Sequence, residues 1–537
     1  MAAISKAGSA WAPFRIGIFR ALWLAALVSN IGNWMQSVGA QWLLIHQPHA
    51  SILVALVQTA SALPTVLLAY IGGVAADIFN RRWLLIIVQG CLVVTGLAIT
   101  LLTIAGEMTP ALLLALTFLL GAGSAFSLPA YQALIPDLVP RSELPAATAA
   151  SSINVNLAQA AGPAIAGVLI AQSGPGAVFA LNTVTFLVFG VVLLGWHPHA
   201  GTSAQFPEPF VSALRAGGRY VRHAGAVRRI LLRASLFLVP ASALWALLPL
   251  VASERLGLGA GGYGLMLAIL GVGSICGAFS LPYIRARIST NVLLLVSSLV
   301  YAAALIVLVL VPNVAVILLV LLPTGVAWIA VLVSINASMI LFLPGWVRAR
   351  ALAVYQMVLF GALAAGAALW GAVAGPEGLV TTFLIAAAVM IAGAATMGLW
   401  PLLATEGPDR DRSVAVYWPE PQLVPEFDPK SGPVVVMRIY TITAENERAF
   451  LQGMSIVRQS RLRTGALEWG LYRNGEAAHR FLEFFVVPTW EEHLRQHHER
   501  QTGDDWRALE QMDALSDPRP ETSHFLRARI LVTGTTP

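Results

Sequence analysis

The sequence predicts an all-α polytopic membrane protein that continues into a small soluble α+β domain. Of the 537 residues, 57% are hydrophobic and only 11% are charged, whereas a soluble globular chain is about 25% charged. Residues 1–403 carry 17 basic and 7 acidic side chains, a net charge of +10, whereas residues 404–537 carry 16 and 20, a net charge of −4. This composition excludes a soluble enzyme, a disordered chain and a nucleic-acid-binding protein with a basic surface, so we expect no nucleic acid as a partner.

Twelve apolar segments are long enough to cross a bilayer, which takes about 20 residues. They are residues 18–45, 51–75, 83–105, 110–134, 146–172, 177–195, 229–252, 261–284, 291–311, 314–341, 351–374 and 379–402. The connections HQPHA, GE, SGPG, VPN and GPEG contain no Lys or Arg, whereas the alternate connections contain Arg81, Arg82, Arg141, a cluster from Arg215 to Arg233, Arg285, Arg287, Arg348 and Arg350. Because basic connections stay in the cytoplasm, both termini are expected there.

An internal repeat divides the spans into two halves. An offset of 204 residues relates Gly73 to Gly277, Arg81 to Arg285, Pro140 to Pro344, Gly162 to Gly366 and Gly167 to Gly371. We therefore predict two six-helix bundles, residues 1–195 and 229–403, joined by a cytoplasmic linker over 196–228. Repeats of this parallel kind build one large class of transporters, whose substrate site lies between the halves.

The remaining chain is predicted to form a tether and a cytoplasmic domain. Residues 404–431 are rich in proline and charge, as expected of a tether. Residues 432–537 alternate between strand-like and helix-like segments in the order βαββαβ, which is ferredoxin-like; a single helix is expected from Thr489 to about Leu515. Because such a sheet leaves one face uncovered, we expect the domain to pair, making the protein a homodimer.

Span one carries a polar stripe that is a candidate wall of a binding cavity. Asn30, Asn33, Trp34, Ser37 and Gln41 recur at helical spacing on one face. Lipid offers amides no partners, so this face meets protein or water. It either binds a small-molecule cargo or packs against neighbouring helices. The same two interpretations apply to Asn336 in span ten and to Asn154, Asn156 and Gln159 in span five.

Two segments carry a resemblance to the major facilitator superfamily. GGVAADIFNRR between spans two and three is similar to the signature loop of that superfamily, and AQAAGPAIAG in span five resembles the Gly-Pro motif of its antiporter branches. The resemblance implies a cytoplasmic gate at Gly73, Asp77, Arg81 and Arg82. There Asp77 would face the helix N-terminus that begins near Ala351, a place that stabilises a carboxylate; alternatively, the loop is only an interfacial stop. Asn80 suits the turn, since asparagine tolerates a left-handed backbone.

The antiporter-like motif Gly162, Pro163 and Gly167 either bends span five to seal a leak path or only packs helices closely. The segments FRALW, GNWMQSVGAQWLL, LPAYQALIPDLVPRSEL, WVRARALAVYQ and EEHLRQHHERQT narrow the resemblance to the bacterial transmembrane secretion effectors, related to the enterobactin exporter. Residues 432–532 also resemble the antibiotic-biosynthesis monooxygenase type of domain, which pairs through its sheets.

The resemblance implies a multi-pass protein of the bacterial plasma (inner) membrane that exports a small organic molecule, such as a drug or a siderophore, by alternating access and proton-coupled antiport. Two other hypotheses stay open: an importer of the same fold, and an enzyme or sensor centred on the C-terminal domain. No catalytic constellation, cofactor motif or metal-ligand spacing supports an enzyme. His493, His497 and His498 lack an accompanying metal motif.

No acidic or basic residue lies in the middle of any predicted span, where proton relays are usually found. The groups nearest to such a position are Arg20, Asp77, Asp137 and Glu254, which lie at span ends. The absence of mid-membrane charge favours a neutral or amphipathic cargo.

Overall fold

A computed structural model describes residues 11–196, 218–344, 346–398, 400–402 and 432–527. The predicted tether and most of the predicted linker lie outside these residues. The chain divides into two compact units. The first contains residues 1–207, 230–337 and 355–402, and the second contains residues 208–229, 338–354 and 403–537. Each unit is built from its own contacts.

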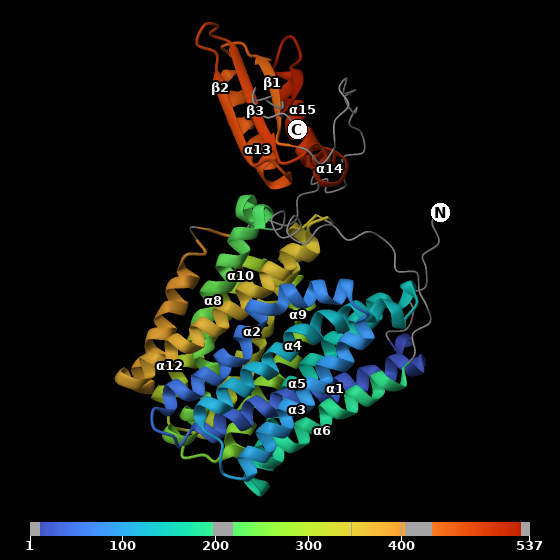
Figure 1. Ribbon diagram of the computed structural model, residues 1–537. Coiled ribbons are helices and arrows are strands. Elements are labelled where there is room, and N and C mark those ends of the chain that lie inside the picture. The colour runs from blue at the N-terminus through green and yellow to red at the C-terminus, as the bar shows by residue number, and fades with distance from the viewer. Residues whose placement is uncertain (1–10, 197–217, 345, 399, 403–431, 528–537) are drawn as a thin grey trace, which may run out of the picture. The chain divides into compact units, whose positions relative to one another are not determined.

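Long helices make up almost all of the first unit (Figure 1). The helices are α1 (Gly17–Leu44), α2 (Ala50–Ile78), α3 (Arg81–Ile104), α4 (Pro110–Leu138), α5 (Leu144–Ser173), α6 (Pro175–Gly195), α8 (Gly225–Leu250), α9 (Ala260–Arg285), α10 (Thr290–Leu310), α11 (Val314–Phe342) and α12 (Arg348–Ala395), with the short turns η1 (Ala12–Arg15), η2 (Arg141–Glu143) and η3 (Val251–Arg255). Each predicted span lies on one of these helices, and most boundaries agree within a few residues.

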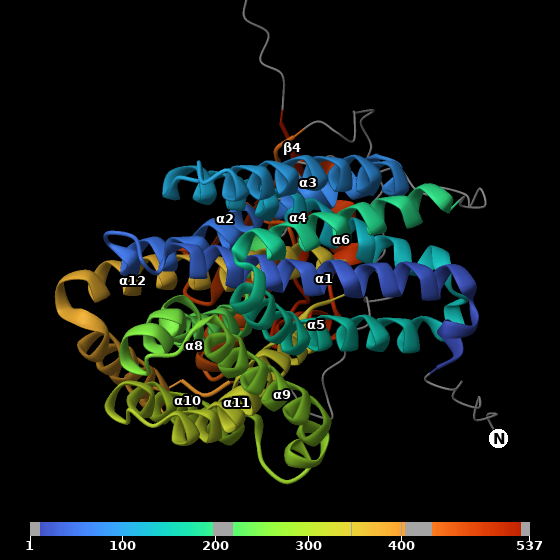
Figure 2. The same cartoon turned by 90° about the horizontal axis from the view of Figure 1, so that it is seen from below.

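Ten helices among the described residues are long and apolar enough to cross a membrane. Two features separate this number from the twelve predicted spans. The helix α1 is 28 residues long but is not among the ten, because the amides of its polar stripe lower its hydropathy. The 48-residue helix α12 is interrupted at Gly378, whose φ of 76° is not helical, and the chain turns back there (Figure 2). Twelve spans therefore stay a prediction.

Asn80 plays a different part from the one predicted. Its backbone has φ −61° and ψ 114°, so it is extended rather than left-handed. Its side-chain oxygen accepts hydrogen bonds from the backbone nitrogens of Arg82 at 3.1 Å and Trp83 at 3.3 Å. Asn80 is therefore the N-cap of α3, which satisfies backbone donors that the first helical turn leaves without partners.

The second unit contains a four-stranded antiparallel sheet with the strand order β2-β3-β1-β4. Its elements are β1 (Val434–Thr441), α13 (Glu447–Thr464), β2 (Glu468–Arg473), β3 (Arg480–Val487), α14 (Trp490–Arg495), η4 (Gln496–Arg500), α15 (Gly503–Ala514) and β4 (Glu521–Leu526) (Figure 1). The predicted βαββαβ order agrees with this topology.

The prediction of a single helix from Thr489 to about Leu515 is wrong. The segment has three parts, because η4 ends at Arg500 and the next residue, Gln501, has an extended backbone. A new helix then starts at Thr502, where the Thr502 hydroxyl and the Asp505 carboxylate each accept a hydrogen bond from the other's backbone nitrogen. Such a capping box is a strong helix start, and the sequence TGDD that encodes it contains the signal for the break.

The helices cover one face of the sheet, where charged side chains are buried among apolar ones. Every second residue of β1 lies on this face: Val434, Val436, Arg438 and Tyr440. Glu483 on β3 is fully buried and accepts hydrogen bonds from Tyr440 at 3.1 Å, Trp469 at 3.0 Å and Arg461 at 3.3 Å. Burial raises the pKa of Glu483, but the charges of Arg461 and Arg438 outweigh burial and hold it below its usual value.

Candidate functional site

A buried polar contact joins α1 to α8 and α9. The side-chain nitrogen of Gln41 donates to the main-chain oxygen of Trp245 at 3.2 Å, and the Tyr263 hydroxyl donates to the side-chain oxygen of Gln41 at 2.6 Å. Gln41 is 3% exposed and Tyr263 is 1% exposed. The contact therefore links the first half of the chain to the second at the end of the bundle where α1 ends and α2 begins.

Three further contacts between the halves involve α2, α5, α9 and α12. The Thr59 hydroxyl on α2 donates to the carbonyl oxygen of Ala364 on α12 at 3.0 Å. A Cβ at Gly167 on α5 would lie 3.0 Å from Cα of Gly264 on α9, and one at Gly371 on α12 would lie 3.1 Å from the carbonyl oxygen of Ser51 on α2. We call the contacts of Gln41, Thr59, Gly167 and Gly371 the inter-repeat seal.

The contacts of the predicted antiporter-like motif recur at the repeat offset. A Cβ at Gly162 would meet Trp34 and Ile31 on α1, and one at Gly366, 204 residues later, would meet Ser242 and Val239 on α8. Gly167 and Gly371, which are also 204 residues apart, place α5 against α9 and α12 against α2. The repeated glycines thus make equivalent helix contacts, so the offset read from sequence has a geometric counterpart. Pro163 adds its carbonyl oxygen to the α5–α9 contact, 2.6 Å from a Cβ at Gly264.

The predicted polar stripe is split between packing and open positions. Asn30 donates to Asn154 at 2.9 Å, and Asn154 donates to the Trp23 carbonyl at 2.9 Å, so these amides pack α1 against α5. The Ser37 hydroxyl donates to the carbonyl oxygen of its own helix at Asn33. The half-buried side chain of Asn33 has no hydrogen bond within the described part of the chain.

The other stripe positions differ in burial. The Trp34 ring is half-buried and lies 5.7 Å from the Trp245 ring, which lies 5.2 Å from that of Trp328. This aromatic array runs from the first half of the chain into the second. Asn336 is exposed on α11. In span five, Gln159 is buried, whereas the half-buried Asn156 donates to its own helix at Ser152.

Two of the predicted gate residues anchor helix ends within the first half. Arg81 donates to the Ala133 carbonyl and to the Asp137 carboxylate of α4, both at 3.0 Å. Arg82 donates to the carbonyls of Leu193 at 2.9 Å and Leu194 at 2.8 Å, which end α6. Cationic side chains are favourable at these carbonyl-rich helix ends. The side chain of Asp77 and the surroundings of Gly73 lie outside what the structure describes.

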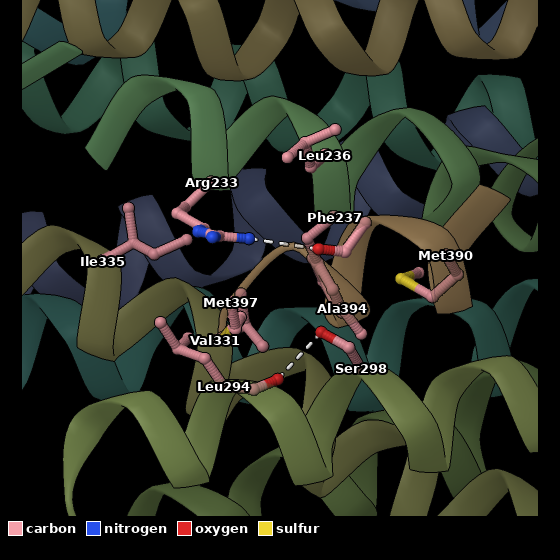
Figure 3. A pocket seen from close by; sticks show the side chains of 11 residues that line it. Arg233, Leu236, Phe237, Leu294, Ser298, Val331, Ile335, Met390, Ala394 and Met397 are labelled. Carbon is pink, nitrogen blue, oxygen red and sulfur yellow. Dashed lines mark hydrogen bonds between the residues drawn. The ribbon is translucent and has the colours of Figure 1, made fainter. Parts of the chain in front are cut away.

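Arg233, from the basic cluster that supports the predicted membrane orientation, makes a similar contact. Its guanidinium, 4% exposed, donates to the carbonyls of Gly393, Thr396 and Trp400 at 3.1, 2.7 and 2.6 Å and so caps the end of α12. Beside it lies a cavity of about 10 Å³ lined by Arg233, Leu236, Phe237, Leu294, Ser298, Val331, Ile335, Met390, Gly393, Ala394 and Met397 (Figure 3). That volume is about that of one water probe, so it is no cargo site.

A larger cavity opens at the same end of the bundle as the inter-repeat seal. Its volume is about 450 Å³, within the range of small-molecule sites. The polar side chains that line it are His46, Gln47, Ser51 and Glu254. The interrupted backbone at Gly378 also borders it. Glu254, one of the few acids near a span end, thus belongs to a cavity between the halves.

The family model of the transmembrane secretion effectors, within the major facilitator superfamily, matches residues 8–530. The chain belongs to this family. Its family and its long apolar helices make it a multi-pass membrane protein. Within the described residues, no group of three or more His, Cys, Asp and Glu side chains is placed to hold a metal ion, and this includes His493, His497 and His498.

Curated relatives of the transporter align over parts of their length. A staphyloferrin A transporter of Staphylococcus aureus is 26% identical over 31% of this chain and 42% of the relative. The uncharacterised MFS-type transporter YfiS of Bacillus subtilis is 31% identical over 31% of this chain and 39% of the relative. A macrolide efflux protein A of Streptococcus pyogenes is 21% identical over 44% of this chain and 59% of the relative. The chain thus spans less than two thirds of each of these relatives.

Solved transporter structures share the fold of the helical part. A POT family transporter in complex with a thioalcohol-conjugated peptide superposes with a TM-score of 0.60 at 12% identity, covering 71% of this chain and 95% of that one. A bacterial homologue of the human lysosomal transporter Spinster, in an inward-facing and unoccupied conformation, superposes with a TM-score of 0.55 at 16% identity. The match covers 72% of this chain and 95% of that one. At such identities the likeness establishes the fold alone.

Proposed function

We propose that the transporter exports a small organic molecule by alternating access between two six-helix halves, coupled to inward movement of protons. The observation that carries this proposal is the inter-repeat seal. It joins the halves at the end where α1 meets α2, with buried hydrogen bonds at Gln41 and close backbone contact at Gly167. Close contacts at that end are what a transporter closed on that side requires. An importer of the same fold would use the same seal, so direction is decided by experiment.

The proposed topology has twelve spans with both termini in the cytoplasm of a bacterial cell, in its plasma (inner) membrane. Counting α1 as a span and dividing α12 at Gly378 adds two spans to the ten apolar helices. The arginines at connections such as Arg81–Arg82 and Arg348 support the cytoplasmic assignment. The proposed domains are residues 1–195, 196–228, 229–403, 404–431 and 432–537.

We propose that Asn33, Trp34, Ser37 and Asn336 contact the cargo. Asn33 has a half-buried amide without a hydrogen bond among the described residues, and the Trp34 ring begins an aromatic array that crosses between the halves. Asn30 and Gln41 are engaged with protein partners in this state, so their contact with cargo would require the other state. Amides and indoles suit a neutral or amphipathic molecule. The names of two relatives make a siderophore or a macrolide the first compounds to test.

The proposed cytoplasmic gate contains Gly73, Asp77, Arg81 and Arg82, with Asp77 facing the start of α12. The proposed proton-binding group on the opposite side is Glu254. Its support is its place in the 450 Å³ cavity beside His46, at the end of the bundle closed by the inter-repeat seal.

We further propose that the transporter forms a homodimer through its C-terminal sheet. The face of the sheet turned away from its helices carries Val435, Met437, Leu482, Phe484 and the 51%-exposed Phe525. Met437 and Phe484 are paired across the two central strands. A Met437→Cys substitution, in a background with Cys91→Ser and Cys276→Ser, should yield disulfide-linked dimers in membranes. The variant Ser455→Cys, on α13 beyond the opposite face, is the control; equal cross-linking would contradict the model.

Transport itself is tested with everted membrane vesicles that are energised by a respiratory proton gradient. An exporter accumulates a radiolabelled macrolide or siderophore inside such vesicles, and collapse of the gradient abolishes accumulation. Accumulation only in right-side-out vesicles would indicate an importer. Accumulation that is unaffected by loss of the gradient would contradict proton coupling.

A further inference from the structure

The second compact unit brings the C-terminal domain together with two segments that join transporter helices. One segment, residues 338–354, contains the end of α11, the turn that follows it and the start of α12; the other, residues 208–229, leads into α8 and includes its first residues. The described part of the latter includes a helical turn over 218–223. From here on, residues 338–354 are called the connector, and the name linker is used for residues 208–229 alone.

The domain contacts both segments through α14 and η4. The guanidinium of Arg500 on η4 lies over the Trp346 ring of the connector, 5.2 Å from its centre. The Glu492 carboxylate on α14 lies 3.9 Å from the Arg219 guanidinium of the linker. The Trp346 ring in turn meets the Tyr220 ring edge-on at 5.7 Å. One small patch of the domain therefore contacts the linker and the connector at once.

This patch is fixed from inside the domain. Arg500 is 3% exposed, and it donates to both oxygens of Glu492 at 2.8 and 3.1 Å and to the Thr464 carbonyl at 3.1 Å. Burial raises the pKa of Glu492, but the hydrogen bonds and charge of Arg500, followed by the charges of Arg219 and Arg495, hold it below its usual value. Glu492 is therefore ionised at neutral pH. Its charge complements a basic linker, in which burial and then the nearby charges of Arg222 and Arg228 lower the pKa of His223.

We propose that this face of the C-terminal domain is a docking surface for the linker and the connector of the same chain. We call this contact the clasp, and it consists of Arg219, Tyr220, Trp346, Glu492 and Arg500. The segment before α8 joins the two halves, and the connector lies between two helices of the second half. Holding both segments together restrains the movement of the halves on the cytoplasmic side. This consequence rests on the proposed alternating access, whereas the contact itself does not.

The contact is tested by cutting the chain in place. A protease recognition sequence inserted within residues 404–431 allows the domain to be severed in membrane vesicles with the cytoplasmic side outward. After sedimentation, a severed wild-type domain that is held by the clasp stays with the membranes. Domains held only by each other would leave together in the supernatant. Release of the wild-type domain immediately after cleavage overturns the proposal.

Two variants test whether the clasp holds the domain. Both substitutions lie outside the C-terminal domain, so they leave its fold unchanged. Trp346→Ala removes the ring under Arg500, and Arg219→Gln removes the charge beside Glu492. Each should raise the released fraction, with Trp346→Ala weakening binding about tenfold, as expected for a partly desolvated cation–π contact. Arg222→Gln, an exposed neighbour of Arg219 on the same turn, is the matched control. Retention that is equal in all variants shows that the domain is held elsewhere and overturns the proposal.

The restraint is measured separately from binding. In the uncut transporter, a single cysteine at Gly361 on α12, in the background without Cys91 and Cys276, reports access from the cytoplasmic side by its rate of maleimide labelling. The expected result is a changed rate in Trp346→Ala and an unchanged rate in Arg222→Gln. An unchanged rate in both overturns the restraint. Neither measurement requires a transported compound, so failure of the proposed export would be seen independently, in the vesicle assay.

Discussion

Gln41 and Trp245 are separated by 204 residues, the same offset that relates the two repeats, and they contact each other through a hydrogen bond of 3.2 Å. Two positions that are equivalent in a pair of repeats lie close together only near the axis that relates the repeats. The contact therefore marks where α1 and α8 meet on that axis. A single glutamine at this place connects both halves, since its other end accepts from Tyr263.

The first prediction concerns Gln41→Leu. This change leaves the buried Tyr263 hydroxyl and the Trp245 carbonyl without their partner, at a cost of about 1–3 kcal/mol for each unsatisfied group. We expect the closed state at this end to be less populated. The measurement is the maleimide labelling rate of a cysteine at Ser51, which lines the larger cavity. Gln36→Leu is the control, because Gln36 bonds to Asn182 within the first half. Equal labelling in the two variants would show that Gln41 does not hold the seal.

A second prediction concerns Gly167→Ala. The added methyl group would lie 2.9 Å from the Ala260 carbonyl and 3.0 Å from Cα of Gly264, so α5 and α9 must separate. Overpacking of this kind costs about 1–3 kcal/mol. We expect transport to fall at unchanged membrane abundance. Gly195→Ala, which meets nothing within 4 Å, should transport normally. Full activity of Gly167→Ala would mean that the close contact is dispensable.

A third prediction concerns Arg233→Met. The guanidinium satisfies three carbonyls at the end of α12, and hydrogen bonds to charged groups are worth about 1.5–3 kcal/mol each. We expect the detergent-solubilised protein to unfold at a temperature lower by several degrees. The exposed Arg228 provides the comparison, and Arg228→Met should leave the midpoint unchanged. An unaltered midpoint for Arg233→Met would rule out a stabilising cap.

A fourth prediction concerns the pH dependence of the C-terminal domain. Burial, together with the charges of His524 and Arg461, lowers the pKa of His493 to about 3, whereas the unfolded value is about 6.5. Below pH ~6.5 the unfolded chain thus binds a proton that the folded chain does not. As the pH is lowered from ~6.5 to about 3, the free energy of unfolding should therefore fall by about 1.4 kcal/mol per pH unit because of this one group.

Hydrogen exchange of β1 in the full-length transporter, measured at several pH values, checks this slope. His493→Phe should reduce it, because the site then no longer titrates. The exposed His498 serves for comparison, and His498→Phe should retain the wild-type slope. If both variants behave as wild type, the pH dependence arises from other groups, such as Glu483 or His497.

The helices and the α+β topology were predictable from sequence because long apolar runs and strand alternation are local signals. The repeat was predictable because Gly162 and Gly366 occupy equivalent contacts. The role of Gln41 was not, since an amide on a helix face looks the same whether it meets cargo, water or another helix. The repeat offset was nevertheless a signal for its partner, because adding 204 to position 41 gives position 245.

Arg233 illustrates the other limit. The sequence places it in a basic cluster before a span, and positive charge in such a place indicates orientation. Its three carbonyl partners lie 160 to 167 residues further along the chain, a distance at which no local pattern connects them. The same holds for the clasp, where Trp346 and Arg500 come from separate predicted domains.

The anchoring of Arg81 and Arg82 has a consequence for biogenesis. Their carbonyl partners are contributed by segments 52 to 112 residues downstream, which leave the ribosome later than α3. Until those segments are synthesised, neither guanidinium group has the carbonyl acceptors that it bonds in the folded protein. The order of translation thus becomes an order of assembly, in which the first bundle is complete only when the end of α6 arrives.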